Sequence, residues 1–481
     1  MGTSTDHALG RNLRFFCDVE ATPGGAYGTG GQETLVGADA AKVLATSMEF
    51  SVARNDRTDS RTTRSVLERI TGKQEVSWSC ESYLLPAGVP TPPDIAPLLH
   101  AGFGSGPYVG SDTTLGTGTL TGASVASSCI VTFGAGHPFK LNDQVYFTGV
   151  VGMTQLNGLT GKVTSVNANG TDVTFDINSS TFSSWSAGGT QKALLQTYRV
   201  SDNNALPTVH MMRTTNGVLR EDLFGCWVEE VGISASGGEE PKISFSGGAF
   251  NYVLTGAGTT EGTGSGATSL ITESGEGVNF MVGSSITVMN GASVQDRIVT
   301  AKSSDTLTIA SSTWADAIAI TPTTYTEATA GSPINGISGS LLFNGVSLPI
   351  TSFEMTMANT VKAISDEAMV KGTSDFIAGY RATTGSVSVR ARKDMIKSLA
   401  QRYVQTTATA DPSFSSIPVV VTLGSTTDYK CVITMATCEI NFSGIEIPEA
   451  EEVILTIPFT VLGATGADDS NQEILFSWNQ D

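Results

Sequence analysis

The amino-acid sequence predicts a mainly β fold in which one β-domain occurs twice, each copy with a short helix, together with two small inserted barrel-like modules. Composition is the first indication: of 481 residues, 40% are hydrophobic and only 15% are charged, and Gly, Ser and Thr fill the segments between hydrophobic stretches. Polar and apolar residues alternate in many short runs, which is the period of half-buried strands. Several of these runs recur in the same order later in the chain.

The first predicted elements are two strands and a helix. Residues 47–54 and 75–83 alternate apolar with polar side chains, so each is expected to form a strand with one face against a core. Prolines and apolar spacing predict a short helix over residues 91–103, bent or shortened at Pro97. A long hairpin followed by a helix is therefore expected in the N-terminal part of the chain.

The same order of elements recurs in the C-terminal part. An alternating run over residues 351–359 resembles the first strand, and a helix is expected over residues 393–404. Further matches pair Thr71-Gly72 with Thr384-Gly385, residues 224–236 with 429–441, and residues 252–257 with 460–464. Ordered matches at several places predict an internal duplication more strongly than any single motif does.

Two more segments interrupt this pattern and resemble each other, since both contain alternating runs separated by turns. Each is predicted to be a small antiparallel barrel, and their Gly-, Ser- and Thr-rich flanks have the composition of exposed linkers. We therefore expect both on an outer surface. The predicted organisation is 1–104 and 194–257 for the first repeat, 105–193 for the first insert, 258–332 for the second insert and 333–481 for the second repeat.

The charge of the chain restricts its partners. A formal net charge of −19 and a sequence pI near 4.6 argue against a protein that grips phosphate backbones through basic patches. No run approaches the roughly 20 apolar residues needed to cross a bilayer, and residues 1–14 lack the apolar segment of a signal peptide. Neither export by that route nor membrane insertion is expected.

The six cysteines are predicted to be free, buried thiols in a reducing compartment, because they form no C-x-x-C pair and accompany no histidine cluster. Cys431 and Cys438 lie in one strand-like run an odd number of residues apart. Their side chains are therefore expected on opposite faces, where they cannot pair.

Candidate catalytic residues are few. The four histidines (His7, His100, His137 and His210) are scattered, so a nucleophile–histidine arrangement has few possible bases. Adjacent glutamates such as Glu229-Glu230 face opposite ways in a strand, which disfavours a carboxylate pair. We expect no enzymatic activity, no metal and no cofactor.

A cluster of arginines is unusual in so acidic a chain. It lies in the polar connection of residues 55–69 and consists of Arg57, Arg61, Arg64 and Arg69. It can be a solvated hairpin loop, or a loop that reaches an acidic surface on a neighbouring subunit. Nucleic-acid binding is the least favoured of the three interpretations, given the overall charge.

An alternating strand, a long polar loop, Thr-Gly, a second alternating strand and a short helix resemble the tail tube (major tail) proteins of long-tailed siphophages. The resemblance implies a β-sandwich flanked by a helix in each repeat, with sheets that join around a ring and rings that stack into a hollow tube for DNA. It also implies a location in the virion tail after assembly in the host cytoplasm. Tape measure, tail terminator and tail tip proteins are the implied partners.

Carried over to this chain, the resemblance gives two sets of candidate residues. The arginine loop, with Arg57, Arg61, Arg64 and Arg69, takes the position of the contact between rings. The polar faces of the two hairpins become candidates for the channel lining, with the acidic residues Glu49, Glu75, Glu81 and Glu354. Because most family members carry one domain per chain in hexameric rings, two domains per chain suggest a trimer with pseudo-sixfold symmetry.

Two other classes remain as alternatives. A surface adhesin or carbohydrate-binding array of β-modules would also be acidic and rich in Gly, Ser and Thr. A tail-associated depolymerase would need converging carboxylates and often a run of β-solenoid repeats, neither of which is visible in the sequence. The tail tube interpretation explains the ordered duplication best.

Overall fold

A computed structural model describes much of the chain. The described residues are 13–22, 35–56, 69–88, 91–105, 117–134, 137–186, 192–201, 206–215, 218–290, 293–325, 331, 333–334, 339–343, 346–348, 350–364, 373, 375–390, 415–426, 429–440, 453–463 and 473–478. Strands dominate these residues, and α1 (Ala96–Phe103) is the one α-helix among them. Short 3-10 turns occur at Gly37–Asp39, Thr154–Leu156 and Glu276–Asn279. The predicted mainly β class is confirmed.

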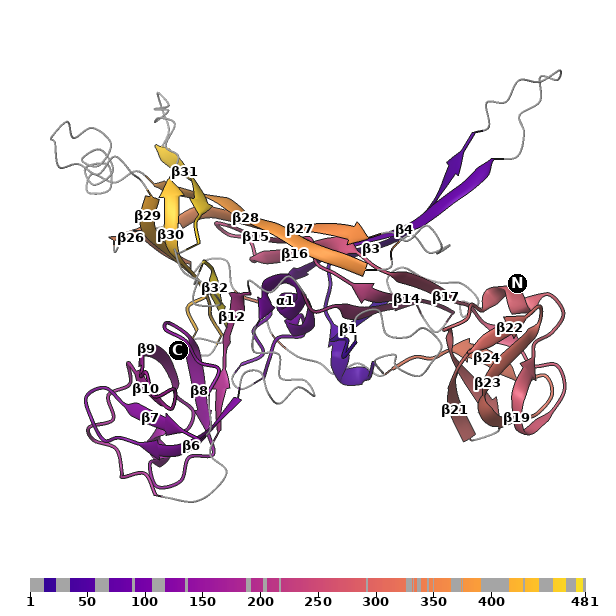
Figure 1. Ribbon diagram of the computed structural model, residues 1–481, viewed down its shortest axis with the longest axis horizontal. Coiled ribbons are helices and arrows are strands. Elements are labelled where there is room, and N and C mark those ends of the chain that lie inside the picture. The colour runs from indigo at the N-terminus through magenta and orange to yellow at the C-terminus, as the bar shows by residue number, and fades with distance from the viewer. Residues whose placement is uncertain are drawn as a thin grey trace.

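A sheet of 14 strands extends across the molecule, and we call it the long sheet (Figure 1). Its main path runs through β26 (Val346–Leu348), β25 (Ser340–Phe343), β29 (Ser415–Leu423), β30 (Cys431–Ile440), β31 (Ile454–Val461), β28 (Asp375–Arg390), β27 (Ile350–Ile364), β15 (Glu230–Ser236), β16 (Lys242–Gly248), β4 (Ile70–Tyr83) and β3 (Ala45–Asn55). Off this path lie β5 (Gly104–Ser105), β12 (Thr197–Val200) and β32 (Leu475–Ser477). Both predicted hairpins, β3–β4 and β27–β28, thus belong to one sheet.

A smaller sheet of five strands packs against the long sheet. Its order is β17 (Asn251–Thr255), β14 (Leu219–Cys226), β13 (Val209–Thr215), β1 (Leu13–Val19) and β2 (Ala40–Ala41). Side chains from both sheets share one core, in which Phe15 and Met211 of the small sheet lie with Trp78, Phe245 and Met355 of the long one. Burial of this apolar surface from both halves of the chain is the main source of stability.

Helix α1 lies in the predicted region but is shorter than expected, and all its residues are buried. Pro97 falls in the first turn, where the backbone nitrogen has no intrahelical acceptor, so the proline does not disrupt the helix. The helix ends at Gly104, whose φ of 76° is left-handed. The second predicted helix, residues 393–404, lies outside the described residues.

The first insert is a closed barrel, as predicted. Its strands follow the order β10 (Asp172–Phe175), β7 (Ile130–Phe133), β6 (Thr117–Ala123), β11 (Lys192–Leu195), β8 (Gln144–Thr148) and β9 (Thr160–Val166). Phe133, Phe147 and Phe175 fill its interior. The period-2 pattern identified this module because each short strand presents one face to that interior.

The second insert departs from the barrel prediction. Its described strands form two sheets, namely β18 (Gly258–Thr259), β24 (Ala319–Pro322), β20 (Ser285–Asn290) and β21 (Ser293–Ile298) in one, and β19 (Gly264–Ile271), β23 (Thr306–Trp314) and β22 (Ala301–Ser303) in the other. Both sheets enclose a single core around Phe280, Leu307 and Trp314. Alternation could not distinguish the two arrangements, since both bury one face of every strand.

The two hairpins of the long sheet carry a β-bulge at the same place. In β3–β4, the cross-strand residue pairs on either side of the bulge are Val52–Gln74 and Arg54–Thr71. In β27–β28 they are Asn359–Arg381 and Val361–Ala378. In each case the second strand has one extra residue, and Gly72 and Gly379 occupy the same position. The sequence match of Gly72 with Gly385 is therefore displaced; Gly385 lies in mid-strand opposite Phe459.

A second pair of bulges relates the strands that follow. The flanking pairs are Val209–Cys226 and Met211–Leu223 in β13–β14, and Ile417–Cys438 and Val419–Met435 in β29–β30. By register, Cys226 therefore matches Cys438, not Cys431 as the sequence suggested. The match of residues 252–257 with 460–464 is also displaced, because β17 pairs with β14 as β32 pairs with β30.

The six cysteines are free and buried, which confirms this part of the prediction about them. The reason given for Cys431 and Cys438 was wrong, however, because both side chains are fully buried. The bulge between Met435 and Cys438 shifts the alternation by one residue and turns Cys438 back toward the core. Burial raises the pKa of both thiols.

Candidate functional site

One face of the long sheet is polar across both halves of the chain. In β27, Phe353 and Met355 are buried whereas Glu354 is exposed, and the other strands alternate in the same way. Figure 1 shows α1, the five-stranded sheet and both inserted modules on the side of the buried face. We call the opposite side, which no other described element covers, the polar face.

Strand registers align the residues of the polar face into rows that cross both halves. One row runs Glu81, Ser244, Gly232, Thr356, Thr384, Thr460 and Glu439. A neighbouring row runs Lys242, Ser234, Glu354, Ser386 and Pro458. Apart from the charged residues, these side chains are small, so the face is smooth and densely lined with hydroxyl groups.

The glutamates predicted from the sequence lie on this face. Glu49, Glu75 and Glu354 are exposed and Glu81 is partly exposed. The structure adds Glu230 and Glu439, which are also exposed. Glu230 could have been found from the sequence, because E-V-G-I-S-A-S over 230–236 alternates as clearly as the hairpin strands do.

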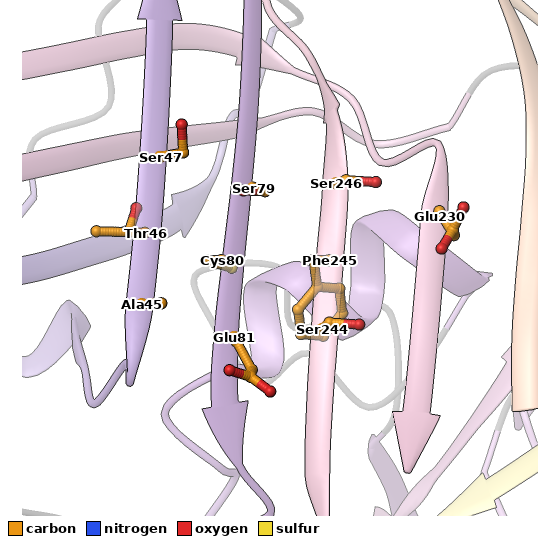
Figure 2. Close-up of a pocket in the computed structure, with 10 residues that line it drawn as sticks. All are labelled: Ala45, Thr46, Ser47, Ser79, Cys80, Glu81, Glu230, Ser244, Phe245 and Ser246. Carbon is orange, nitrogen blue, oxygen red and sulfur yellow. The ribbon is translucent and has the colours of Figure 1, made fainter. Parts of the chain in front are cut away.

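A shallow groove of about 330 Å³ runs over the first half of the polar face. Figure 2 shows serines of β4 and β16 along its floor, with Glu81 and Glu230 on either side of β16. The two carboxylates belong to strands two apart in the sheet, so they are not directly opposed. The arrangement offers hydrogen-bonding groups and negative charge over an open surface.

Cations are few on the described part of this face. Lys242 Nζ lies 3.5 Å from Glu81 Oε1, and both side chains remain more than a third exposed. Arg390 lies at the far end of β28 and is exposed. Glutamates thus outnumber cations on the described polar face.

The arginine loop can be described only at its base. Arg57, Arg61 and Arg64 lie outside the described residues. Arg69 Nε donates to Asp56 Oδ1 at 2.6 Å, and both side chains are more than half exposed. An ion pair this exposed contributes little to stability. Figure 1 shows the hairpin β3–β4 projecting away from the rest of the molecule.

Buried arginines hold the inserted modules, and sequence reasoning missed their contacts. Arg199 of β12 donates to Asp143 Oδ2 at 2.6 Å and to Pro138 O at 2.7 Å, which ties the barrel to the long sheet. Burial raises the pKa of Asp143 to about 6, although Arg199 opposes the shift. Removing either partner would leave a buried charge unpaired.

A second buried group fixes the other module. Arg220 donates twice to Asp222, at 2.7 and 2.8 Å, and its third contact is Thr323 O at 3.0 Å. His210 Nε2 lies 3.1 Å from Asp222. Burial alone would raise the pKa of Asp222, but Arg220 and His210 hold it below its usual range. In the sequence, the run L-R-E-D-L-F sets charged residues between apolar ones, and this pattern could have indicated a buried charged group.

His7 lies outside the described residues, and the other two histidines have structural surroundings. His100 is buried in α1, and His137 packs against Phe133 and Phe139 of the barrel. No group of three or more His, Cys, Asp or Glu side chains within the described residues is arranged to hold a metal ion. In that same part of the chain no helix has the length and apolarity required to cross a membrane.

Comparison with known proteins gives no family assignment: no protein-family model and no curated protein sequence matches this chain.

Proposed function

We propose that this chain is the structural subunit of a phage tail tube and that the polar face lines the channel through which DNA leaves the particle. The observation that carries the proposal is the long sheet itself. One uninterrupted sheet contains both hairpins, and its glutamate-rich face is left uncovered by the other described elements. A sheet whose other side is buried in a core is suited to form part of a wall.

The proposed subunit contains two copies of one tube domain, each a β-sandwich. Two pairs of matched bulges support this, because a bulge is a specific local irregularity and unrelated sheets have no reason to share its position. The strand order supports it too, since β3-β4-β16 is repeated as β27-β28-β31. Three such chains would supply six domains to a ring.

The chemistry of the polar face suits a conduit for DNA. Fixed carboxylates repel the phosphates of a duplex, and at close range salt screens that repulsion only in part. Within the described residues, small hydroxyl-bearing side chains line this face and no arginine cluster that would bind the backbone tightly lies among them. DNA would therefore pass this surface without adhering to it.

The two inserted modules are proposed to decorate the outside of the tube. They lie on the side of the sheet away from the polar face (Figure 1). The ion pair Arg199–Asp143 and the contact of Arg220 with Thr323 fix them to the body, so each is held in a defined orientation. Tape measure, terminator and tip proteins remain the partners expected for such a tube, and the virion tail the expected location.

Electron microscopy of the purified, concentrated chain tests the proposal directly. We expect rings with pseudo-sixfold outlines that stack into hollow tubes. A chain that stays monomeric at high concentration and binds glycans would instead support a surface adhesin, and the tube proposal would fail.

The role of the polar face can be tested separately from assembly. Replacing Glu49, Glu75, Glu81 and Glu354 with Gln should slow DNA release from particles built with the variant while tubes still assemble, because the exposed carboxylates contribute little to the fold. A matched control replaces Glu239, Glu240, Glu261 and Glu273, which are exposed elsewhere. Equal release rates for both variants would remove the polar face from the channel.

A further inference from the structure

The two inserted modules are attached to corresponding strands of the two halves. Counted from the matched bulges, β17 beside β14 takes the place of β32 beside β30, and Gly256 takes the place of Trp478. Gly256 N donates to Asn279 O of the second module at 2.8 Å, and Trp478 N donates to Gln196 O, where the barrel ends, at 2.9 Å. The two joints therefore contain the same backbone hydrogen bond at matching positions.

The joints differ in whether charge crosses them. At the second module, Arg220 and Asp222 both belong to β14, and Arg220 reaches the module through the uncharged carbonyl of Thr323. At the barrel the ion pair itself crosses the joint, because Asp143 belongs to the barrel and Arg199 to β12, with the two atoms 2.6 Å apart. Separating the barrel from the body would split this buried pair, whereas separating the second module would leave Arg220 with Asp222.

Asp143 is enclosed in the barrel joint. Its side chain is fully buried, with Oδ2 accepting from Arg199 and from Lys140 N at 2.7 Å, while Oδ1 is buried without a hydrogen-bond partner. The charged groups that face it are Arg199 from β12 and Lys140 from its own loop. His137, in the same loop, stacks on Phe139 instead. The strands that flank β12, β32 and β5, place no charged residue opposite Arg199.

The protonation of Asp143 is linked to the joint. Burial raises the pKa of Asp143 to about 6, although Arg199 opposes the shift. If the barrel separated from β12, the side of the carboxylate that faces Arg199 would meet water, and its pKa would fall toward the ordinary value of about 4. Because the docked state binds the proton more tightly than the separated state, acid favours docking. This contribution is fully present below about pH 4 and is lost as the pH rises through about 6.

We propose that the barrel joint is a proton-linked latch, in which protonation of Asp143 tightens the barrel on β12 while the joint of the second module does not respond. Protonation removes the charge that burial penalises, and Oδ2 can still accept from Arg199. Asp222 provides the contrast: burial alone would raise its pKa, but Arg220 and His210 hold it below its usual range. Mild acid therefore changes how firmly one outer module is held and leaves the other as it was.

Hydrogen exchange of the full chain measures both joints in one experiment. The amides of Gln144, which donates to Thr197 Oγ1 at 2.8 Å, and of Trp478 report on the barrel joint, and the amide of Gly256 reports on the other joint. Lowering the pH from 7.5 to 5.0 should raise the protection factor, corrected for intrinsic exchange, about tenfold at Gln144 and Trp478. Protection at Gly256 should change by less than about twofold over the same interval.

Two matched variants separate the latch from general stability. Asp143→Asn keeps an oxygen that can accept from Arg199 but does not titrate, so it should give high protection of the barrel joint at both pH values. Asp94→Asn removes another buried carboxyl group, whose pKa burial also raises to about 6, but which lies just before α1. The pH difference at the barrel joint should therefore survive Asp94→Asn.

Three results would overturn the latch. One is a change of equal size at Gln144 and Gly256, which would report the stability of the whole chain. The second is a barrel joint that loosens at pH 5.0, since this reverses the expected sign. The third is a pH difference that persists in Asp143→Asn. If that variant does not fold, the comparison of Gln144 with Gly256 in the unaltered chain decides alone.

Discussion

The hairpins β3–β4 and β27–β28 share a bulge but differ in how they are supported. The distal part of β27–β28 rests on the body of the molecule through Phe376, which packs among Trp227 and Phe250. The distal part of β3–β4 projects from the body, and the matching position carries Arg69 in an exposed pair with Asp56. The comparison teaches that one backbone design can pack against the body of the molecule or project from it, depending on the side chains around it.

The largest expected effect comes from removing the aromatic support of β27–β28. Trp227→Ala should lower the free energy of unfolding by about 3–5 kcal/mol, because a buried ring is lost and a cavity remains. Phe50→Ala, at the half-exposed ring of the other hairpin, should cost about 1 kcal/mol or less in the isolated chain. Chemical denaturation monitored by circular dichroism measures both. Similar losses would mean that the two hairpins are equally supported.

A smaller effect is expected at Gly385, which lies within β28 of the second hairpin. A Cβ at Gly385 would lie 2.4 Å from Glu354 O and 2.5 Å from the Phe459 ring, so Gly385→Ala should destabilise the chain by about 1–3 kcal/mol. In the first hairpin the matching residue is Trp78, which faces Gly247 instead. Thermal unfolding compares the stability of Gly385→Ala with that of the bulge variant Gly379→Ala. In the bulge variant, the added Cβ would lie 3.0 Å from Thr360 O. A variant at position 385 as stable as the parent would contradict this packing.

The smallest effect is expected at the base of the arginine loop. Arg69→Ala should change the free energy of unfolding by no more than about 0.5 kcal/mol, because its pair with Asp56 is solvated. Urea titration at low and at 0.5 M salt provides the measurement, and the two salt conditions should agree closely. A loss comparable to that of Trp227→Ala would show that the projecting hairpin depends on this pair.

The sequence predicted the elements that a single period defines. Alternation identified the strands of both hairpins and placed Glu49, Glu75, Glu81 and Glu354 on a common face. Alternation could not show that Gly379 occupies the position in β27–β28 that Gly72 occupies in β3–β4, because a bulge changes the register without changing the local pattern. The ion pair of Arg199 with Asp143 and the hydrogen bond from Arg220 to Thr323 O were equally hidden, since these partners lie far away in the chain.

The pairing of β15 with β27 was also beyond the sequence. Each strand alternates as any half-buried strand does, and nothing in E-V-G-I-S-A-S specifies that its neighbour comes from the other half of the chain. Long-range edge pairing depends on how the two cores dock. That docking is what turns two separate hairpins into one continuous polar face.

A cryo-electron microscopy reconstruction of the assembled protein tests the central claim most directly. The account predicts three chains per ring, with the face that carries Glu49, Glu230 and Glu354 toward the channel and both inserted modules outside. A ring of six chains would contradict the duplicated subunit, and a polar face turned away from the channel would contradict the proposed function.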